Sequence, residues 1–341
     1  MRLLRWMLAP LSPLYGATIR ARNRAFDTNP DRATPLPVPV ISIGNLSSGG
    51  TGKTPLTLHL AEQLAAAGWT NMILSRGYGG RRQVDPMDVA PASNPAETGD
   101  EPLMMAQRLG PGRVVVGRKR LSAGLRALAR NPRLLLLDDG FQHRALKRDV
   151  DLLLLDGVRL WGKGKMLPTG DLREPMESAH RADALVVTRG SRAPKNEVLA
   201  WWQRYGSGGP VFWVDFEIGG LREFPHGSAL PISEHNPSPL FAFCALGHPE
   251  AFYADLMIAG LSWVGYHSFP DHQAIGKAGL QALAREAEKA SAAALVCTEK
   301  DAVKLNPAFC EGLNMQIWIA QQTVRGAEPL VDFLLERLKA L

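Results

Sequence analysis

The sequence predicts an α/β fold in which a mostly parallel β-sheet is covered by helices and followed by a smaller C-terminal α/β unit. From residue 38 onward, short apolar segments alternate with segments of helical periodicity. The apolar segments are continuous, which indicates strands buried on both faces and hence a parallel sheet. A glycine-rich turn joins the first strand to the first helix, an order of elements that favours binding of a phosphate group.

Residues 40–57 carry this strand, turn and helix. The turn and the start of the helix are formed by Gly49, Gly50, Thr51, Gly52, Lys53 and Thr54. We expect these residues to bind nucleotide phosphates, with Lys53 at the β- and γ-phosphates and the Thr54 hydroxyl on Mg²⁺. Ser47 replaces the first glycine of the common P-loop pattern, and Gly49 and Gly50 are expected to supply the flexibility instead. The alternative is a turn that binds nothing.

The rest of the first unit continues the alternation. Strands are expected at residues 71–75, 113–116, 134–137, 152–155 and 184–188, and helices at 103–109 and 119–130. Ligands of parallel sheets bind beyond the carboxyl ends of the strands. Polar residues follow several of these strands, namely Ser75-Arg76, Asp138-Asp139, Asp156-Gly157 and Thr188-Arg189. We expect them to lie at the same edge of the sheet as the glycine-rich turn.

A glycine-rich stretch at residues 207–210 predicts a boundary between a P-loop domain, residues 1–210, and a smaller domain, residues 211–341. The second domain is expected to contain strands at 211–216, 240–246, 294–298 and 316–320 and helices at 249–259, 273–289 and 329–341. It is therefore a second α/β unit.

Composition and charge limit the class of partner. The chain has 341 residues, a net charge of +6 and 45% hydrophobic residues, and its isoelectric point is near 9.3. A basic protein suits an anionic partner such as a nucleotide, a phosphorylated substrate or an acidic lipid. No nucleic-acid-binding module is recognisable, so nucleic acid is not expected. Three cysteines without C-x-x-C spacing favour a reducing cytoplasm and argue against a structural metal site.

The N-terminal segment, residues 1–26, combines leucines and Trp6 with arginines, including Arg20, Arg22 and Arg24. Arg5 and two prolines interrupt its apolar part, which argues against a secretory signal. Two interpretations remain. The segment is either a basic amphipathic element on an anionic membrane surface or a helix packed on the protein's own core.

Two acidic motifs are candidates for catalysis. Asp138 and Asp139 follow an apolar strand, where a carboxylate commonly binds the Mg²⁺ of a bound nucleotide; the alternative is an ordinary turn. Asp100 precedes a helix and has the chemistry to accept a proton from an attacking hydroxyl. The alternative is a helix N-cap, with Pro102 in the first turn.

Several colinear motifs together resemble one family. They are I-G-N-L at 43–46, G-G-T-G-K-T-P at 49–55, S-R-G-Y-G at 75–79, G-D-E-P at 99–102, D-D-G-F-Q-H at 138–143, L-R-E-P at 172–175, F-P-D-H at 269–272 and T-E-K-D-A-V-K at 298–304. This set resembles tetraacyldisaccharide 4′-kinase, the lipid A 4′-kinase of Gram-negative bacteria. The resemblance spans most of the chain.

The resemblance implies an enzyme peripheral to the cytoplasmic face of the inner membrane. It would transfer the γ-phosphoryl group of ATP to the 4′-hydroxyl of an acylated glucosamine disaccharide 1-phosphate, giving lipid IVA, in a cleft that closes between two domains. No protein partner is implied. Two rival hypotheses are a P-loop nucleotide switch protein and a kinase of a water-soluble small molecule.

Roles carried over from the family fall on motif residues of this chain. Asp100 would be the general base, oriented by His272, and Lys53 would act on the transferred phosphate. Asp138 or Asp139 would bind Mg²⁺ with Thr54, and Glu174 would join the outer shell of the metal. Acceptor contacts would come from Arg76, Gln142, His143 and Arg173.

Overall fold

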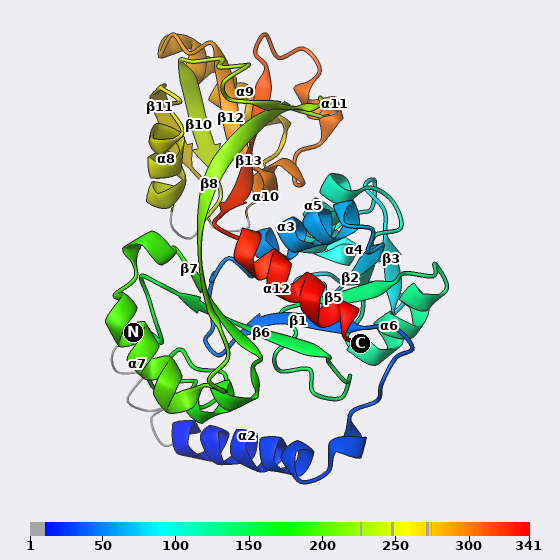
Figure 1. Cartoon of the computed structure of the whole chain (residues 1–341). Coiled ribbons are helices and arrows are strands. Elements are labelled where there is room, and N and C mark those ends of the chain that lie inside the picture. The colour runs from blue at the N-terminus through cyan, green and yellow to red at the C-terminus, as the bar shows by residue number, and fades with distance from the viewer. Residues whose placement is uncertain (1–10, 226, 247–248, 271–272, 274) are drawn as a thin grey trace.

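The computed structural model describes residues 11–225, 227–246, 249–270, 273 and 275–341. Within these residues, thirteen strands form one sheet, in the order β11-β10-β12-β13-β8-β7-β6-β1-β5-β2-β4-β3, with β9 paired to β8. Figure 1 shows helices on both sides of this sheet. The predicted α/β class, a mostly parallel sheet covered by helices, is confirmed.

The first half of the sheet is built around β1. Its strands are β1 (Val40–Asn45), β2 (Asn71–Ser75), β3 (Met87–Val89), β4 (Val114–Val116), β5 (Leu134–Asp138), β6 (Val150–Asp156) and β7 (Ala184–Thr188). Strand β1 lies between β5 and β6 and is parallel to both, and all six of its residues are buried. Only β3 runs antiparallel, beside β4. The continuous burial agrees with the apolar runs of the sequence.

Helices connect these strands. They are α3 (Lys53–Ala66), α4 (Pro95–Thr98), α5 (Asp100–Leu109), α6 (Arg120–Leu128) and α7 (Lys195–Tyr205), with 3₁₀ turns at Pro30–Arg32, Met176–Arg181 and Gly190–Arg192. The sequence did not predict α7. Its buried face consists of Val198, Trp201 and Trp202, a pattern too sparse in aliphatic residues to stand out as an amphipathic helix.

The C-terminal unit adds a second group of parallel strands. Its elements are β8 (Val211–Glu223), β9 (Ala229–Pro231), β10 (Leu240–Cys244), α8 (Pro249–Ile258), β11 (Trp263–Ser268), α9 (Lys277–Lys289), β12 (Ala294–Thr298), α10 (Glu299–Ala302), α11 (Pro307–Cys310), β13 (Ile317–Arg325) and α12 (Glu328–Lys339). Strand β10 is central, parallel to β11 and β12. The sequence missed β11, an edge strand whose side chains alternate between exposed and half-buried.

Two strands are longer than predicted and join the two units. Strand β8 was expected to end near residue 216 but continues to Glu223, and β13 continues to Arg325 rather than 320. The start of β8 runs parallel to β7, and the rest runs antiparallel to β13. Figure 1 shows β8 passing from one unit to the other. Helix α12 then returns to the first unit, where Leu330, Leu334 and Leu338 share a core with β1 and α3. The domain boundary at residues 210/211 remains a prediction.

Helix α2 (Leu11–Asp27) lies at the end of the molecule opposite α9 (Figure 1). It is held by hydrogen bonds from Ser12 to Thr169 (2.6 Å), from the Tyr15 hydroxyl to the carbonyl of Arg173 (3.0 Å) and from Asn23 to Glu174 (2.6 Å). The second half of the N-terminal segment is therefore packed on the protein. Residues 1–10, which carry Trp6 and Arg5, lie outside the described residues. No helix in the described part of the chain is long and apolar enough to cross a membrane.

Candidate active site

The glycine-rich turn between β1 and α3 is shaped by two glycines. Gly49 has φ +112° and Gly52 has φ +78°, values that side-chain-bearing residues rarely adopt. A Cβ on Gly52 would also overlap the ring of Phe216. Ser47, by contrast, has no positive φ and forms an antiparallel bridge with Leu172. The backbone at this position therefore does not require the glycine of the common pattern.

Lys53 is the first residue of α3, and its Nζ lies 3.2 Å from Oδ1 of Asn45. The same Nζ is 3.6 Å from Oδ1 of Asp139. Arg173 reaches both carboxylate oxygens of Asp139, at 3.0 and 2.8 Å. Burial acts to raise the pKa of Asp139, but Lys53 and Arg173 outweigh it and hold that pKa below its usual value. Asp139 is therefore an anion that positions two cations beside the loop.

Asp138 is the last residue of β5, and only 3% of its surface is exposed. Its carboxylate accepts long hydrogen bonds from the hydroxyls of Thr57 (3.4 Å) and Ser75 (3.5 Å). Burial, together with the nearby charges of Glu101 and Asp139, raises the pKa of Asp138 to about 7. A buried carboxylate among other carboxylates is stabilised by a cation, because the cation offsets both burial and repulsion.

These residues fit Mg²⁺. The ion prefers oxygen ligands and is commonly bound by one or two carboxylates together with substrate phosphates. Thr54 and Asp138 line one cavity with the glycine-rich turn. Within the described ranges no group of three or more His, Cys, Asp or Glu residues converges on one point, so the phosphates and water would complete the ligand set. Asp139, held by Lys53 and Arg173, is less available than Asp138.

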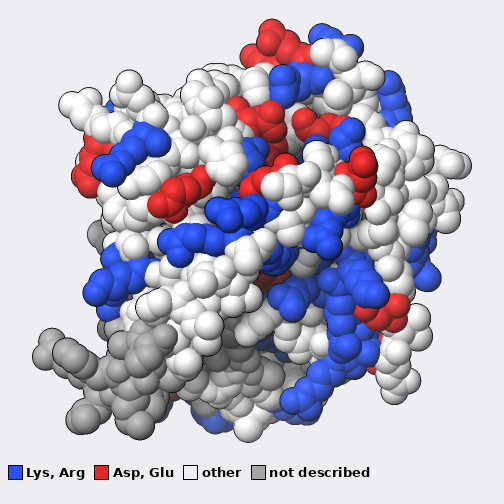
Figure 2. Space-filling view, turned by 90° about the horizontal axis from the view of Figure 1, so that it is seen from below, with Lys and Arg blue, Asp and Glu red and all other residues white. Residues whose placement is uncertain are grey.

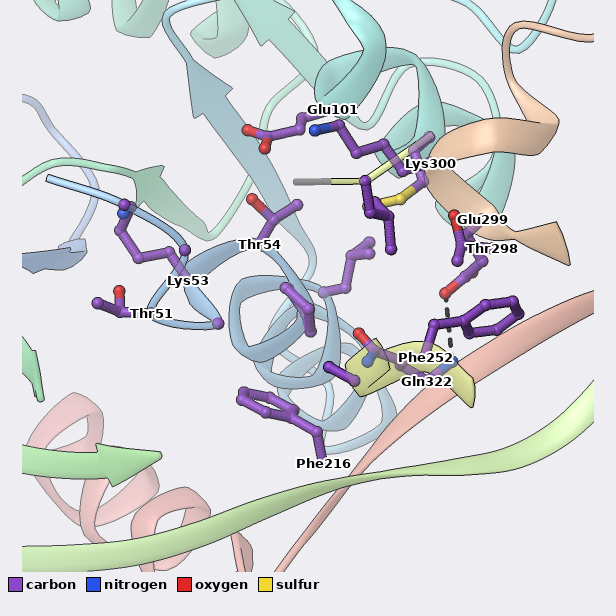
Figure 3. Close-up of a pocket in the computed structure, with 18 of the residues that line it drawn as sticks. Thr51, Lys53, Thr54, Glu101, Phe216, Phe252, Thr298, Glu299, Lys300 and Gln322 are labelled. Atoms are coloured by element: carbon purple, nitrogen blue, oxygen red, sulfur yellow. Dashed lines mark hydrogen bonds between the residues drawn. The ribbon is translucent and has the colours of Figure 1, made fainter. Parts of the chain in front are cut away.

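A cavity of about 660 Å³ extends from this turn to the C-terminal unit. One end is formed by residues 49–55 with Asp138, Asp139 and Arg173, and the other by Phe252, Thr298, Glu299 and Gln322. Figure 3 shows Thr51 and Lys53 on one side, Phe252, Glu299 and Gln322 on the other, and Phe216 below Thr54. The cavity thus spans both units and has a polar, cationic end and an end with an aromatic wall.

Asp100 is the first residue of α5 rather than its N-cap. The N-cap is Gly99, with φ +87°, and no side chain caps this helix. The alternative that Asp100 serves as the N-cap is therefore wrong. Its Oδ2 lies 3.8 Å from Nζ of Lys304, and the next residue, Glu101, lines the cavity. His272 lies outside the described residues, so its pairing with Asp100 remains a prediction.

Glu174 does not line the cavity. It is 1% exposed and pairs with Arg181 through two contacts of 2.9 Å, while Asn23 donates to it at 2.6 Å. Burial acts to raise the pKa of Glu174, but Arg181 and the hydrogen bonds prevail and lower it. These contacts support a structural role, tying α2 to residues 174–181, rather than a place in the outer shell of a metal.

Replacing Glu174 with glutamine is expected to destabilise the fold by about 3–5 kcal/mol at pH 7, because the substitution leaves the buried Arg181 without its anion. The folded pKa is lowered from 4.5, so this stability is present above about pH 4.5 and is lost as the pH falls through the folded pKa. Melting temperatures measured from pH 7 to pH 3 should therefore converge for the two proteins at low pH. Exposed Glu177→Gln is the control, and a constant gap would contradict the assignment.

The remaining candidates gather around His143. Burial, and next the charge of Arg120, lower the pKa of His143 to about 3, with Arg76 and Arg22 acting in the same direction. His143 is therefore neutral at physiological pH. Gln142 donates to the carbonyl of Asn45 at 3.0 Å, so it supports the end of β1. Three arginines from separate elements thus surround a neutral histidine beside Asp139, which forms a cationic region next to the phosphate loop.

Neither Arg120 nor Arg189 was named as a site residue from the sequence, although Arg189 was expected at this edge of the sheet. Buried Arg120 donates to the carbonyl of Asp138 at 3.0 Å, and burial lowers the pKa of Arg120 to about 10. Arg189 reaches Oδ1 of Asp156 at 3.1 Å and the carbonyl of Gly50 at 3.3 Å. Both arginines lie near strand ends, where polar residues were expected to collect. The cavity-lining residues of β8 and β13 had no such signal.

The glycine loop with Lys53, facing a buried carboxylate at the end of a neighbouring parallel strand, defines a P-loop nucleotide-binding protein. A model of the tetraacyldisaccharide-1-P 4′-kinase family matches residues 4–339. The chain belongs to this family. It is therefore an ATP-dependent kinase, and the resemblance inferred from its motifs is confirmed.

Individual relatives agree over almost the whole chain. A tetraacyldisaccharide 4′-kinase from Chromobacterium violaceum is 38% identical over 338 residues, which are 98% of this chain and 94% of the relative. One from Dechloromonas aromatica is 39% identical over 98% of this chain and 92% of its own length. The crystal structure of LpxK from Aquifex aeolicus in complex with ATP is 32% identical, has a TM-score of 0.75 and is matched over 99% of its chain.

Proposed function

We propose that this kinase phosphorylates the 4′-hydroxyl of an acylated glucosamine disaccharide 1-phosphate held in the cytoplasmic leaflet of the bacterial inner membrane, giving lipid IVA. The observation that carries the proposal is the cavity. The phosphate loop and Asp138 form one end of it, and the cationic region around His143 lies next to that end. ATP and an anionic acceptor would thus meet at one point.

The donor side of the reaction rests on the loop. Residues 49–52 hold the phosphates through backbone N–H groups, and Lys53 neutralises the charge that develops on the transferred group. Thr54 and Asp138 hold Mg²⁺, which offsets phosphate charge when bound. Because phosphoryl transfer depends mainly on positioning and charge stabilisation, these groups and an oriented acceptor are sufficient.

The acceptor side rests on Asp100. Its carboxylate accepts the proton of the 4′-hydroxyl as that oxygen attacks the γ-phosphorus, the bond from the γ-phosphorus to the β,γ-bridging oxygen breaks, and ADP leaves. The family resemblance gives His272 the role of orienting the carboxylate. Helix α5 places Asp100 next to Glu101, a residue of the cavity wall. The phosphate of the acceptor binds Arg76 and the neighbouring arginines, because guanidinium groups form paired hydrogen bonds to phosphate oxygens.

One assay tests the reaction. The purified chain is incubated with labelled ATP, Mg²⁺ and tetraacyldisaccharide 1-phosphate in detergent, and the bis-phosphorylated lipid is the expected product. A water-soluble glucosamine disaccharide is the comparison. Equal turnover of the soluble sugar favours a small-molecule kinase, and hydrolysis of ATP that ignores the lipid favours a nucleotide switch.

The membrane surface is proposed to contact the face that carries α2. Leu11 and Leu14 on this helix are 47% and 64% exposed, and Arg20 and Arg24, further along the same helix, are also exposed. Figure 2 shows lysines and arginines spread over this end of the molecule, with few acidic residues in its lower half. Acyl chains cost about 0.8 kcal/mol per exposed CH₂. The enzyme therefore approaches its acceptor at the bilayer.

Reversing two of these charges with Arg20→Glu and Arg24→Glu is expected to weaken binding to anionic vesicles at least tenfold, since each basic residue near such a surface contributes about 1 kcal/mol. Sedimentation with vesicles of phosphatidylethanolamine and phosphatidylglycerol measures the effect. The matched control is Arg285→Glu with Lys289→Glu on α9, at the opposite end of the molecule. Equal losses in both pairs would show an effect of net charge alone and contradict the proposed face.

A further inference from the structure

The part of the cavity farthest from the phosphate loop has not been assigned. The loop fixes where the phosphates of ATP bind, so the base must extend toward another part of the same cavity. Beyond the loop the apolar wall includes Ile218 and Phe252, whereas the ring of Phe216 lies against Gly52 of the loop. Among these walls Gln322 supplies an uncharged amide, and Figure 3 shows that amide directed into the cavity. Apolar walls with a few polar groups, this amide among them, are suited to a heteroaromatic ring.

The backbone of Gln322 is held by charged side chains. Gln322 lies on β13 at a register shift relative to β8, between Gln321 and Gln322. Its N–H donates to Oε2 of Glu299 at 3.3 Å, and its carbonyl accepts from Nη1 of Arg108 at 2.9 Å. Arg108 and Glu299 also contact each other at 3.5 Å. Gln322 lies on the same side of β13 as Ala320, which also lines the cavity. Arg108 and Glu299 hold its backbone there.

Arg108 connects this position to the phosphate loop. Its guanidinium donates to both carboxylate oxygens of Glu62 on α3, at 2.7 and 3.0 Å. Helix α3 begins with Lys53, so the same helix carries the loop cation at its start and the anchor of Arg108 farther along. The distance between the loop and the amide of Gln322 is therefore set by a rigid helix and an ion-pair network. Such preorganisation is what selective recognition requires.

The side chain of Gln322 is available to a ligand. Within the residues that the structure describes, its amide makes no hydrogen bond, since its contacts are through its backbone. An amide presents a donor and an acceptor side by side. Adenine presents the complement, an N6 amino donor next to the ring nitrogen N7, whereas guanine presents two acceptors, O6 and N7, along the same edge.

We propose that Gln322 is the residue that selects adenine over guanine in the nucleotide site, with its amide hydrogen-bonded to the N6 and N7 edge of the base. Ile218 and Phe252 supply the apolar wall for the ring, and Arg108 with Glu299 positions the amide. The proposal rests on the use of ATP as donor by this family, but not on the identity of the acceptor.

Nucleotide binding by the full-length protein tests this directly. A fluorescent ATP analogue is displaced with ATP or with GTP in the presence of Mg²⁺ and without any lipid. Gln322→Met keeps the volume and removes both hydrogen bonds, so its affinity for ATP is expected to fall about tenfold while that for GTP stays the same. Gln322→Glu offers only acceptors, so it loses the hydrogen bond to N7 of adenine and faces two acceptors, O6 and N7, in guanine. Its affinity should therefore fall for both nucleotides.

The control is Gln321→Glu, the same change at the preceding residue of β13, which does not line the cavity. Its ratio of ATP affinity to GTP affinity should equal that of the wild type. Melting temperatures identify a misfolded variant. If Gln322→Glu is unstable beside Glu299, the affinities of Gln322→Met alone test whether the Gln322 amide binds adenine. An unchanged ratio of ATP to GTP affinity in folded Gln322→Met overturns the proposal. Because no acceptor is present, that result is independent of whether the disaccharide is phosphorylated.

Discussion

Replacing Lys53 with methionine is expected to lower kcat for lipid phosphorylation by about two to three orders of magnitude, the usual effect of removing one group that stabilises transition-state charge. The ammonium group lies at the start of α3, 3.2 Å from Asn45 and 3.6 Å from Asp139. Methionine keeps most of the length of the side chain and removes its charge and its N–H donors. Steady-state kinetics with labelled ATP at saturating Mg²⁺ would measure the loss.

The fold should survive this change. Asp139 keeps both contacts to Arg173 after Lys53 is lost, so no carboxylate beside the loop is left without a cation. The melting temperature of Lys53→Met should therefore stay close to that of the wild type, and exposed Lys163→Met should retain full activity. If Lys53→Met kept more than about a tenth of wild-type kcat, the assignment of the loop as the γ-phosphate site would be wrong.

The phosphate loop could be predicted from the sequence because it is a local structure. Strand, glycines, lysine and helix follow one another within residues 40–57. Each of these parts can be recognised from its own residues without knowledge of distant contacts. Ser47 looked like a departure from the pattern, but its position lies in a short bridge with Leu172 and has no positive φ. The requirement for glycine falls on Gly49 and Gly52, both of which the sequence supplies.

The wall opposite the loop could not be predicted, because it depends on pairing between distant segments. The apolar run of β8 is clear only up to about residue 216, yet pairing with β13 extends it to Glu223. That pairing brings Phe216 and Gln322 into the cavity. Glu174 is a conspicuous motif residue whose partner, Arg181, is nearby in sequence and neutralises it inside the protein; its place in the outer shell of a metal remains a prediction. A motif shows that a carboxylate is present, but only the folded structure shows whether that carboxylate is already paired with a cation of the protein.

Asp100→Asn is expected to lower kcat by about two to four orders of magnitude, the range for loss of a general base. Asparagine has the same shape but cannot accept the proton of the attacking hydroxyl. The KM for ATP should change little, because the phosphates are bound by residues 49–54 at another part of the cavity. A fall in kcat with an unchanged KM for ATP is the signature of a group that acts in the chemical step.

A merely structural role for Asp100 makes a different prediction. If the carboxylate served mainly to start α5, asparagine would replace it without loss, since both are good N-caps. Gly99 already occupies the N-cap position and no side chain caps the helix, so the melting temperature of Asp100→Asn should remain within a few degrees of the wild type. Exposed Glu97→Gln, on α4 just before, is the control and should be fully active. Wild-type kcat in Asp100→Asn would reject the base, whereas normal folding with a collapse in kcat would leave proton transfer as the function of Asp100.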